Sequence, residues 1–145
     1  MLAAKSVAIT ANKATPVSAI RAQALGDYMR DAKRGTLHQV AYGKWSYNDG
    51  ENITNGLLPR YKDTNIIWAA NESMALGAYN AIKKLSKNNE VIVGGFRDFP
   101  DALKSIIRGD LILMVAGHPM IGAWALVLLN DYIHGYDFAD IVGAI

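Results

Sequence analysis

Side chains suited to binding a small polar molecule follow several short apolar runs of this sequence. The positions are Trp45 in a Lys-Trp-Ser-Tyr stretch, Asn71 after the run 66–70, Arg97 after the run 90–96, and His118 after the run 111–116. Aromatic faces pack on the C–H surfaces of a polyhydroxylated ligand, and amide or charged groups hydrogen-bond its hydroxyls. These residue types favour binding of a sugar-like ligand.

Each of these positions also has a purely structural interpretation. Helix-periodic apolar residues begin at Met74, so Asn71 could serve only as the N-cap of a helix. Loops are polar in most proteins, which explains charged residues there without any ligand. Trp45 fits this explanation least, because a solvent-facing tryptophan in such a loop has no evident role in a core. We expect Trp45 to face a ligand.

The chain alternates between short apolar runs and helix-periodic segments. Strands are predicted at residues 6–10, 36–42, 66–70, 90–96 and 111–116, and helices at 16–34, 49–58, 74–85, 100–108 and 119–134. Five β-α units in strict alternation predict a doubly wound α/β sandwich of three layers, with a parallel sheet in the flavodoxin-like order 2-1-3-4-5. Such sheets bind ligands at the carboxyl edge of their strands, where the candidate residues lie.

Apolar spacing also predicts which helix faces are buried. The expected stripes are Val17, Ile20, Ala24, Tyr28 and Ala32 in the first helix, Met74, Ala78, Ala81, Ile82 and Leu85 in the third, and Ile121, Ala125, Leu128, Leu129 and Tyr132 in the last. With all five helices packed on the sheet, no apolar face would be left uncovered. The 145 residues are therefore expected to fold as one domain.

Composition argues against several classes of function. The net charge is only +2 and the basic residues are scattered, so clusters such as Arg30/Lys33/Arg34 indicate solvated helix ends, not a nucleic-acid surface. No cysteine is present, which leaves no disulfide or zinc-thiolate site. The start of the chain lacks the pattern of a signal peptide. Residues 111–129 are uncharged and long enough for a membrane span, but Gly117-His118-Pro119 divides them, which favours a buried strand followed by a helix.

Sequence patterns of enzymes and cofactor sites are missing as well. The chain contains no G-x-S-x-G, G-x-x-x-x-G-K-[ST] or G-x-G-x-x-G sequence, and its three histidines lack metal-ligand spacing. Asp98 with His118 could form an acid-base pair, but no nucleophile accompanies them. We expect no catalysis, no cofactor and no metal.

The stretch WAANESMALGAYNAIKKL at residues 68–85 resembles the strand-Asn-Asp/Glu-x-Met-Ala-Leu-Gly-Ala segment of type I periplasmic solute-binding proteins, the ribose- and galactose-binding family. Repressors of the lactose and purine type share this core. The resemblance extends over residues 7–135 and corresponds to the second of the family's two lobes. It implies that residues 1–145 are one lobe, and that the first lobe and the hinge strands are missing from this chain.

The family's ligand-binding positions carry over unevenly. Asn71 matches the ligand asparagine, Trp45 falls where the family has a stacking aromatic, and His118 lies near its glutamine after the fifth strand. Gln23 stands in place of the ligand arginine, with Arg21 two residues earlier, and Arg97 in place of the ligand aspartate. The resemblance thus implies the ligand-binding set Gln23, Trp45, Asn71, Arg97 and His118, with a changed distribution of charge.

By this resemblance the protein is a periplasmic binding protein for a sugar-like ligand, which delivers it to an ABC transporter permease or signals through a sensor kinase. Neither nucleic acid nor membrane insertion is implied. The first alternative is the effector lobe of a cytoplasmic repressor of the lactose type. The Gly-x-Leu sequence at residues 109–111 favours the transport form over that repressor. A flavodoxin-like enzyme is a second alternative.

Overall fold

The computed structural model describes residues 4–32, 35–97, 99–115, 117 and 121–136. Its elements follow one another in the order β1 Ala4–Thr10, α1 Pro16–Ala32, β2 Gly35–Tyr42, α2 Tyr47–Arg60, β3 Ile66–Ala69, α3 Glu72–Lys84, β4 Ile92–Phe96, α4 Pro100–Ile107, β5 Leu113–Val115 and α5 Ile121–Ile133. Strands and helices alternate throughout, as the sequence predicts.

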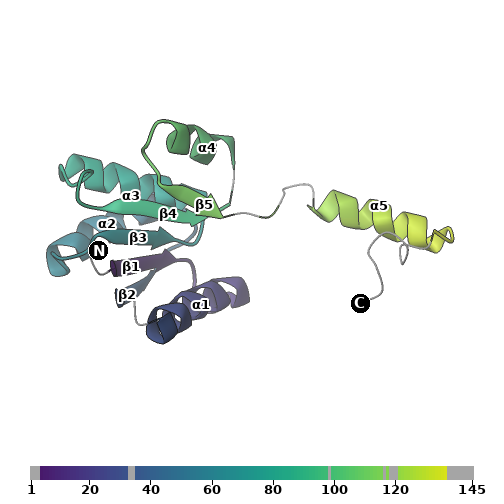
Figure 1. Ribbon diagram of the computed structural model, residues 1–145, viewed down its shortest axis with the longest axis horizontal. Coiled ribbons are helices and arrows are strands. Elements are labelled where there is room, and N and C mark those ends of the chain that lie inside the picture. The colour runs from purple at the N-terminus through teal and green to yellow at the C-terminus, as the bar shows by residue number, and fades with distance from the viewer. Residues whose placement is uncertain (1–3, 33–34, 98, 116, 118–120, 137–145) are drawn as a thin grey trace.

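The five strands form one parallel sheet in the order β2-β1-β3-β4-β5 (Figure 1). The predicted α/β class and strand order are confirmed. Since all strands run in the same direction, the segments that follow them meet at one edge. The chain leaves β5 at that carboxyl edge, and α5 lies beyond it, away from the sheet (Figure 1).

Local sequence explains where α2 begins and ends. It begins at Tyr47, two residues before the predicted start, because the Ser46 hydroxyl caps it by accepting a hydrogen bond from the Asp49 N–H at 3.1 Å. The helix was predicted to end at residue 58, before Pro59, but it runs to Arg60 with Pro59 in its last turn. A proline there removes only one backbone hydrogen bond, and Tyr61 N–H still reaches the Leu57 carbonyl at 2.9 Å.

The core lies between the sheet and the helices α2 and α3. The buried side chains include Val7, Ile9, Ile67, Val93, Met74, Ala78 and Ile82. The predicted α3 stripe is therefore confirmed except at Leu85, which is 42% exposed and forms the C-cap. Helices α2 and α3 approach so closely that a Cβ at Gly77 would overlap the Tyr47 carbonyl oxygen, and one at Gly50 the Met74 backbone.

The predicted buried stripe of α1 is wrong. Val17, Ile20 and Tyr28 are 47%, 64% and 62% exposed, and Ala24 is exposed as well, while Ser18 and Ala22 are buried. The Ser18 hydroxyl lies 2.8 Å from the Thr10 hydroxyl, inside the core. The helix is thus rotated so that a face with small and polar residues meets the sheet. Both faces of α1 carry apolar residues, so hydrophobic spacing alone does not select the buried one.

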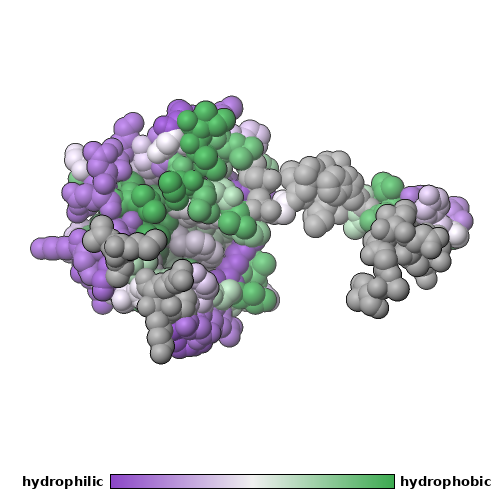
Figure 2. All heavy atoms as spheres, in the orientation of Figure 1, coloured by the Kyte–Doolittle hydropathy of each residue, from purple (hydrophilic) through white to green (hydrophobic). Residues whose placement is uncertain are grey.

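The predicted burial of α5 is also wrong for the side chains that can be placed. Leu128 and Leu129 are 50% and 56% exposed, and Ala125 is exposed too; the side chains of Ile121 and Tyr132 lie outside the described part. The helix projects away from the sheet and does not cover it (Figure 1). On the lobe itself, apolar residues gather over α4 and β5 (Figure 2), where Ile107, Leu113 and Val115 are exposed.

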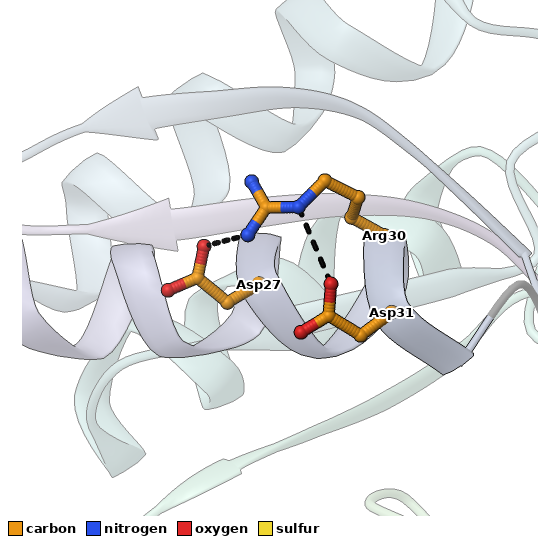
Figure 3. A network of polar contacts seen from close by, with 3 residues as sticks. All are labelled: Asp27, Arg30 and Asp31. Carbon is orange, nitrogen blue, oxygen red and sulfur yellow. Dashed lines mark hydrogen bonds and ion pairs between the residues drawn. The ribbon is translucent and has the colours of Figure 1, made fainter.

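The basic residues at the end of α1 are consistent with a solvated helix end as far as they are described. Arg30 bonds to the carboxylates of Asp27 and Asp31 at 2.6 and 3.3 Å on the outer surface of the helix (Figure 3). Exposed pairs of this kind contribute little to stability. They neutralise the arginine, which argues against a nucleic-acid surface here.

The uncharged stretch 111–129 is divided between β5 and α5. Within the described ranges, no helix combines the length and the hydropathy that crossing a membrane would require.

Candidate functional site

Asn71 joins two of the loops at the carboxyl edge. It is the N-cap of α3, where its Oδ1 accepts a hydrogen bond from the Met74 N–H at 3.0 Å. Its Nδ2 donates to the Trp45 carbonyl oxygen at 2.9 Å. The side chain is buried, with 5% exposed. The amide therefore has a structural function at both ends, as a helix cap and as a link to the Trp45 loop, which is more than the cap alone that the sequence suggested.

Trp45 lies in a loop with a tightly specified backbone. Its φ is +62°, a left-handed conformation that is uncommon for a tryptophan. The Asp49 carboxylate accepts hydrogen bonds from the Lys44 N–H and the Ser46 hydroxyl, both at 2.8 Å. The bond from Asn71 holds the Trp45 carbonyl from the other side. These bonds together fix the unusual backbone.

The expectation that Trp45 has no role in the core is wrong. The ring is half-buried and packs against the hydrophobic core cluster. The reason is that α2 begins directly after this loop and is in close contact with α3, which draws the loop onto the lobe. Trp45 therefore supports the fold with part of its ring, and only the remainder is available to a ligand.

Arg21 was not among the predicted ligand-binding residues. It projects from the inward face of α1, and its Nη1 donates to the Ala70 carbonyl at 2.6 Å. Its guanidinium carbon lies 3.9 Å from the ring centroid of Phe96 and 5.7 Å from that of Trp45. Arg21 thus connects the loops after β2 and β3 with the end of β4, through cation–π contacts to Trp45 and Phe96.

The charge environment of Arg21 is unfavourable for a cation. Burial lowers the pKa of the guanidinium, the positive charge of Arg97 lowers it further, and Glu72 partly offsets both. Glu72 is the first residue of α3, and its side chain is only 13% exposed. One carboxylate is thus shared by two arginines at this edge.

Arg97 stands at the rim of the same cluster. It has a left-handed φ of +88° and continues the β4–β5 ladder by donating its N–H to the Val115 carbonyl at 3.0 Å. Its guanidinium carbon is 4.6 Å from the Phe99 ring centroid. The Arg97 Nε is 3.9 Å from Glu72 Oε2, which is within ion-pair range but too long for a hydrogen bond. That buried oxygen accepts no hydrogen bond from the described residues.

The structure unites only some of the predicted site residues. The Asn71 side chain is hydrogen-bonded to the Trp45 carbonyl. Arg97 is linked to this pair indirectly, because it interacts electrostatically with Glu72 and Arg21. Gln23 is exposed on α1 and takes part in none of these contacts. His118 and Asp98 lie outside the described residues, so the possible acid-base pair is outside them too.

Arg21, Glu72 and Phe96 were not among the predicted site residues, and for Arg21 the reason can be identified. Gln23 follows Arg21 by two helical positions, about 200° around the axis, so only one of the two can face the sheet. The resemblance assigned the family's ligand arginine to Gln23, although the predicted apolar stripe itself runs beside Arg21, whose i−4 and i+3 neighbours are Val17 and Ala24. The hydrogen bond from Arg21 to the Ala70 carbonyl shows which of the two residues faces the sheet.

Within the described ranges, no group of three His, Cys, Asp or Glu residues is arranged to hold a metal ion. The described part of the edge instead offers aromatic faces and the guanidinium groups of Arg21 and Arg97, with the Glu72 carboxylate beside them. Such a set can bind a polar molecule by stacking and hydrogen bonding.

The link between Asn71 and Trp45 can be tested with Asn71→Asp. The carboxylate keeps the helix cap but places an acceptor against the Trp45 carbonyl, which is also an acceptor. We expect urea unfolding to show a loss of about 1–3 kcal/mol, the usual cost of an unsatisfied buried polar group. Asn71→Ser is the control, because it caps α3 without this repulsion and should lose less. Equal stability of Asn71→Asp and the unmodified protein would contradict the link.

Comparison with known proteins identifies a consistent set of relatives. The sequence profile described as "Periplasmic binding protein domain" matches residues 3–137. A fructose import binding protein of Bifidobacterium longum is 30% identical over 93 residues, 63% of this chain and 28% of that protein. A ribose import binding protein of Haemophilus influenzae is 33% identical over 87 residues, 59% of this chain and 29% of that protein.

Solved structures agree with the sequence relatives. A periplasmic sugar-binding protein from Pseudomonas fluorescens superposes with a TM-score of 0.83 at 33% identity, over 93% of this chain and 42% of that one. The binding protein of an arabinose transporter from Shewanella sp. ANA-3 shares the fold, with a TM-score of 0.81 at 19% identity over 93% of this chain and 46% of that one. The chain thus spans less than half the length of these relatives.

Proposed function

The chain belongs to the periplasmic binding protein family, and we propose that it forms one lobe of a two-lobed protein that binds a sugar or a sugar-like molecule. One observation carries the proposal: the carboxyl edge of the sheet brings together Trp45, Asn71, Arg21 and Phe96. These residues offer aromatic faces and hydrogen-bonding groups at the edge where parallel sheets bind ligands. The named relatives are import binding proteins for fructose and ribose.

A second lobe is supported by the position of α5. The helix carries exposed leucine and isoleucine side chains, of which Leu126 and Ile133 are 68% and 71% exposed. An apolar helix is stable in water only when its apolar residues are covered. It lies beyond the carboxyl edge of the sheet (Figure 1), so a body that covers α5 would stand opposite the candidate site. The ligand would then be enclosed between two lobes.

In this proposal the protein acts by binding and does no chemistry. It works in the periplasm and presents its ligand to an ABC transporter permease, or signals through a sensor kinase. The arabinose-transporter component and the sugar import proteins among its relatives support the transport role over a repressor role.

Isothermal titration calorimetry of the full-length gene product tests this function. D-ribose, D-allose, D-fructose and L-arabinose are suitable first ligands because the names of its relatives include them. We expect saturable binding of at least one sugar or sugar derivative with one site per chain. A full-length product without a second lobe would contradict the proposal.

Trp45→Ala in the full-length protein should weaken ligand binding by about ten- to a hundredfold, or about 1–3 kcal/mol, because it removes an aromatic anchor. It should also lower stability, since part of the ring packs against the core. Trp45→Phe is the control, as it keeps an aromatic face and should retain most of the affinity. If Trp45→Ala lost stability but bound the ligand with unchanged affinity, Trp45 would be a core residue alone.

A further inference from the structure

Among the described residues around Phe96, the guanidinium groups of Arg21 and Arg97 share the carboxylate of Glu72. Arg21 and Arg97 come from different elements, and the pKa of the Arg21 guanidinium is lowered by burial and by the positive charge of Arg97. Glu72 is the carboxylate that interacts with both. Its Oε2 is 3.9 Å from the Arg97 Nε and accepts no hydrogen bond from the described residues. Within the part of the chain that the structure describes, Glu72 therefore compensates the two cations incompletely.

Both guanidinium groups retain hydrogen-bond donors that no described residue occupies. An arginine side chain carries five N–H donors. Arg21 uses one of them on the Ala70 carbonyl at 2.6 Å. The nearest carboxylate to the Arg97 side chain among the described residues stays beyond hydrogen-bond distance. Donors remain on both residues for a molecule that enters the site.

Aromatic rings hold the two guanidinium groups in place. Arg21 stacks on Phe96 at 3.9 Å and Arg97 on Phe99 at 4.6 Å from guanidinium carbon to ring centroid. The left-handed φ of Arg97 is fixed in part by its N–H bond to Val115. Little side-chain freedom would thus be lost when a ligand binds, which favours affinity.

We propose that the ligand of this site carries an acid group, either a carboxylate or a phosphate, which Arg97 and Arg21 bind together. Planar guanidinium groups match the geometry of both acids and bind them with paired, charge-assisted hydrogen bonds. An acid group would supply the negative charge that Glu72 alone does not. The half-exposed Arg97, with 50% of its side chain accessible, would meet it first. This inference rests on the proposed binding function and narrows its ligand to sugar acids or sugar phosphates.

The test compares matched neutral and acidic ligands by calorimetry on the full-length protein. The pairs are D-galactose with D-galacturonate, D-glucose with D-glucuronate, and D-ribose with D-ribose 5-phosphate, which separate carboxylate from phosphate. We expect the acidic member of at least one pair to bind at least tenfold more tightly than its neutral partner. Raising the salt concentration should weaken that binding.

Arg97→Gln should remove the preference by weakening binding of the acid at least tenfold, with neutral sugars changed by less than threefold. Arg30→Gln is the matched control, because it removes the same charge from the exposed end of α1 (Figure 3). Equal losses in both variants would mean a long-range charge effect and overturn the inference. Neutral sugars that bind as tightly as their acids would overturn it too, while leaving the sugar-binding function intact. Binding of none of the six ligands would count against both.

Discussion

Replacing Gly77 with alanine should lower the free energy of unfolding by about 2–3 kcal/mol, within the usual range for overpacking. The added Cβ would overlap the Tyr47 carbonyl oxygen and lie 2.9 Å from the Glu51 nitrogen. Both neighbours are backbone atoms of α2, so no side chain can rotate aside and the two helices must separate. The intrinsic helix propensity of alanine would return about 1 kcal/mol, and the loss is expected in spite of it.

Gly56 supplies a matched control for this experiment. It lies in α2, and a Cβ added there would meet nothing within 4 Å. Gly56→Ala should therefore leave stability unchanged or raise it by up to about 1 kcal/mol. Urea unfolding of the two variants side by side separates packing from propensity. Identical unfolding midpoints for Gly77→Ala and Gly56→Ala would disprove the close contact of the helices.

The same contact has a consequence for the ligand site. The Trp45 loop precedes α2, and Asn71 precedes α3, so the separation of these helices sets the distance between the two residues. Forcing α2 away from α3 should lengthen the 2.9 Å bond from Asn71 Nδ2 to the Trp45 carbonyl. Gly77→Ala should thus weaken ligand binding even in the folded fraction. The glycine in the Met-Ala-Leu-Gly-Ala sequence at residues 74–78 is explained by this geometry.

The 145-residue chain alone should bind ligand at least a hundredfold more weakly than the full-length protein. In the proposed arrangement the missing lobe supplies about half of the contacts and excludes water. Three lost hydrogen bonds of about 1 kcal/mol each already amount to about a hundredfold, at about 1.4 kcal/mol per factor of ten. Calorimetry of both proteins with one shared ligand measures the difference. Equal affinities would show that the site lies wholly in this lobe, and the two-lobed proposal would fail.

A shortened chain of residues 1–117 is the control for this comparison. Apart from Asp131, which is half-buried, every side chain of α5 that the structure describes is exposed. Removing α5 should therefore lower the free energy of unfolding of the lobe by no more than about 0.5 kcal/mol. A marked loss of stability would show that α5 packs on this lobe in solution. That result would remove the support that α5 gives to a second lobe.

Most of the architecture could be predicted because it depends on strong local signals. The predicted strands at 6–10 and 66–70 end within one residue of the carboxyl ends of β1 and β3. Asn71 and Pro100 mark helix starts as expected. Strict alternation then fixes a parallel sheet. These features depend only on residues that are close together in the sequence.

The errors arose where burial depends on distant parts of the molecule. The rotation of α1 follows from the Ser18–Thr10 contact and from Arg21 reaching Ala70, forty-nine residues away in the chain. The exposure of α5 reflects where the chain goes after β5, which apolar spacing does not encode. Trp45 packs on the core because of the α2–α3 contact. The structure gathers Trp45, Asn71 and Arg97 at one edge, as predicted, but α1 turns Arg21 inward in place of Gln23.

The two borders of the sheet differ in a way that affects the lobe when it is produced alone. β2 ends the sheet on one side with Thr36, His38 and Gln39 among its residues, whereas β5 ends it on the other with exposed Leu113 and Val115. An apolar border strand offers unpaired backbone groups to any other extended chain. Two copies can therefore add their β5 strands to one another and extend a common sheet. Aggregation of the isolated lobe should start at β5, and Leu113→Lys should delay its precipitation.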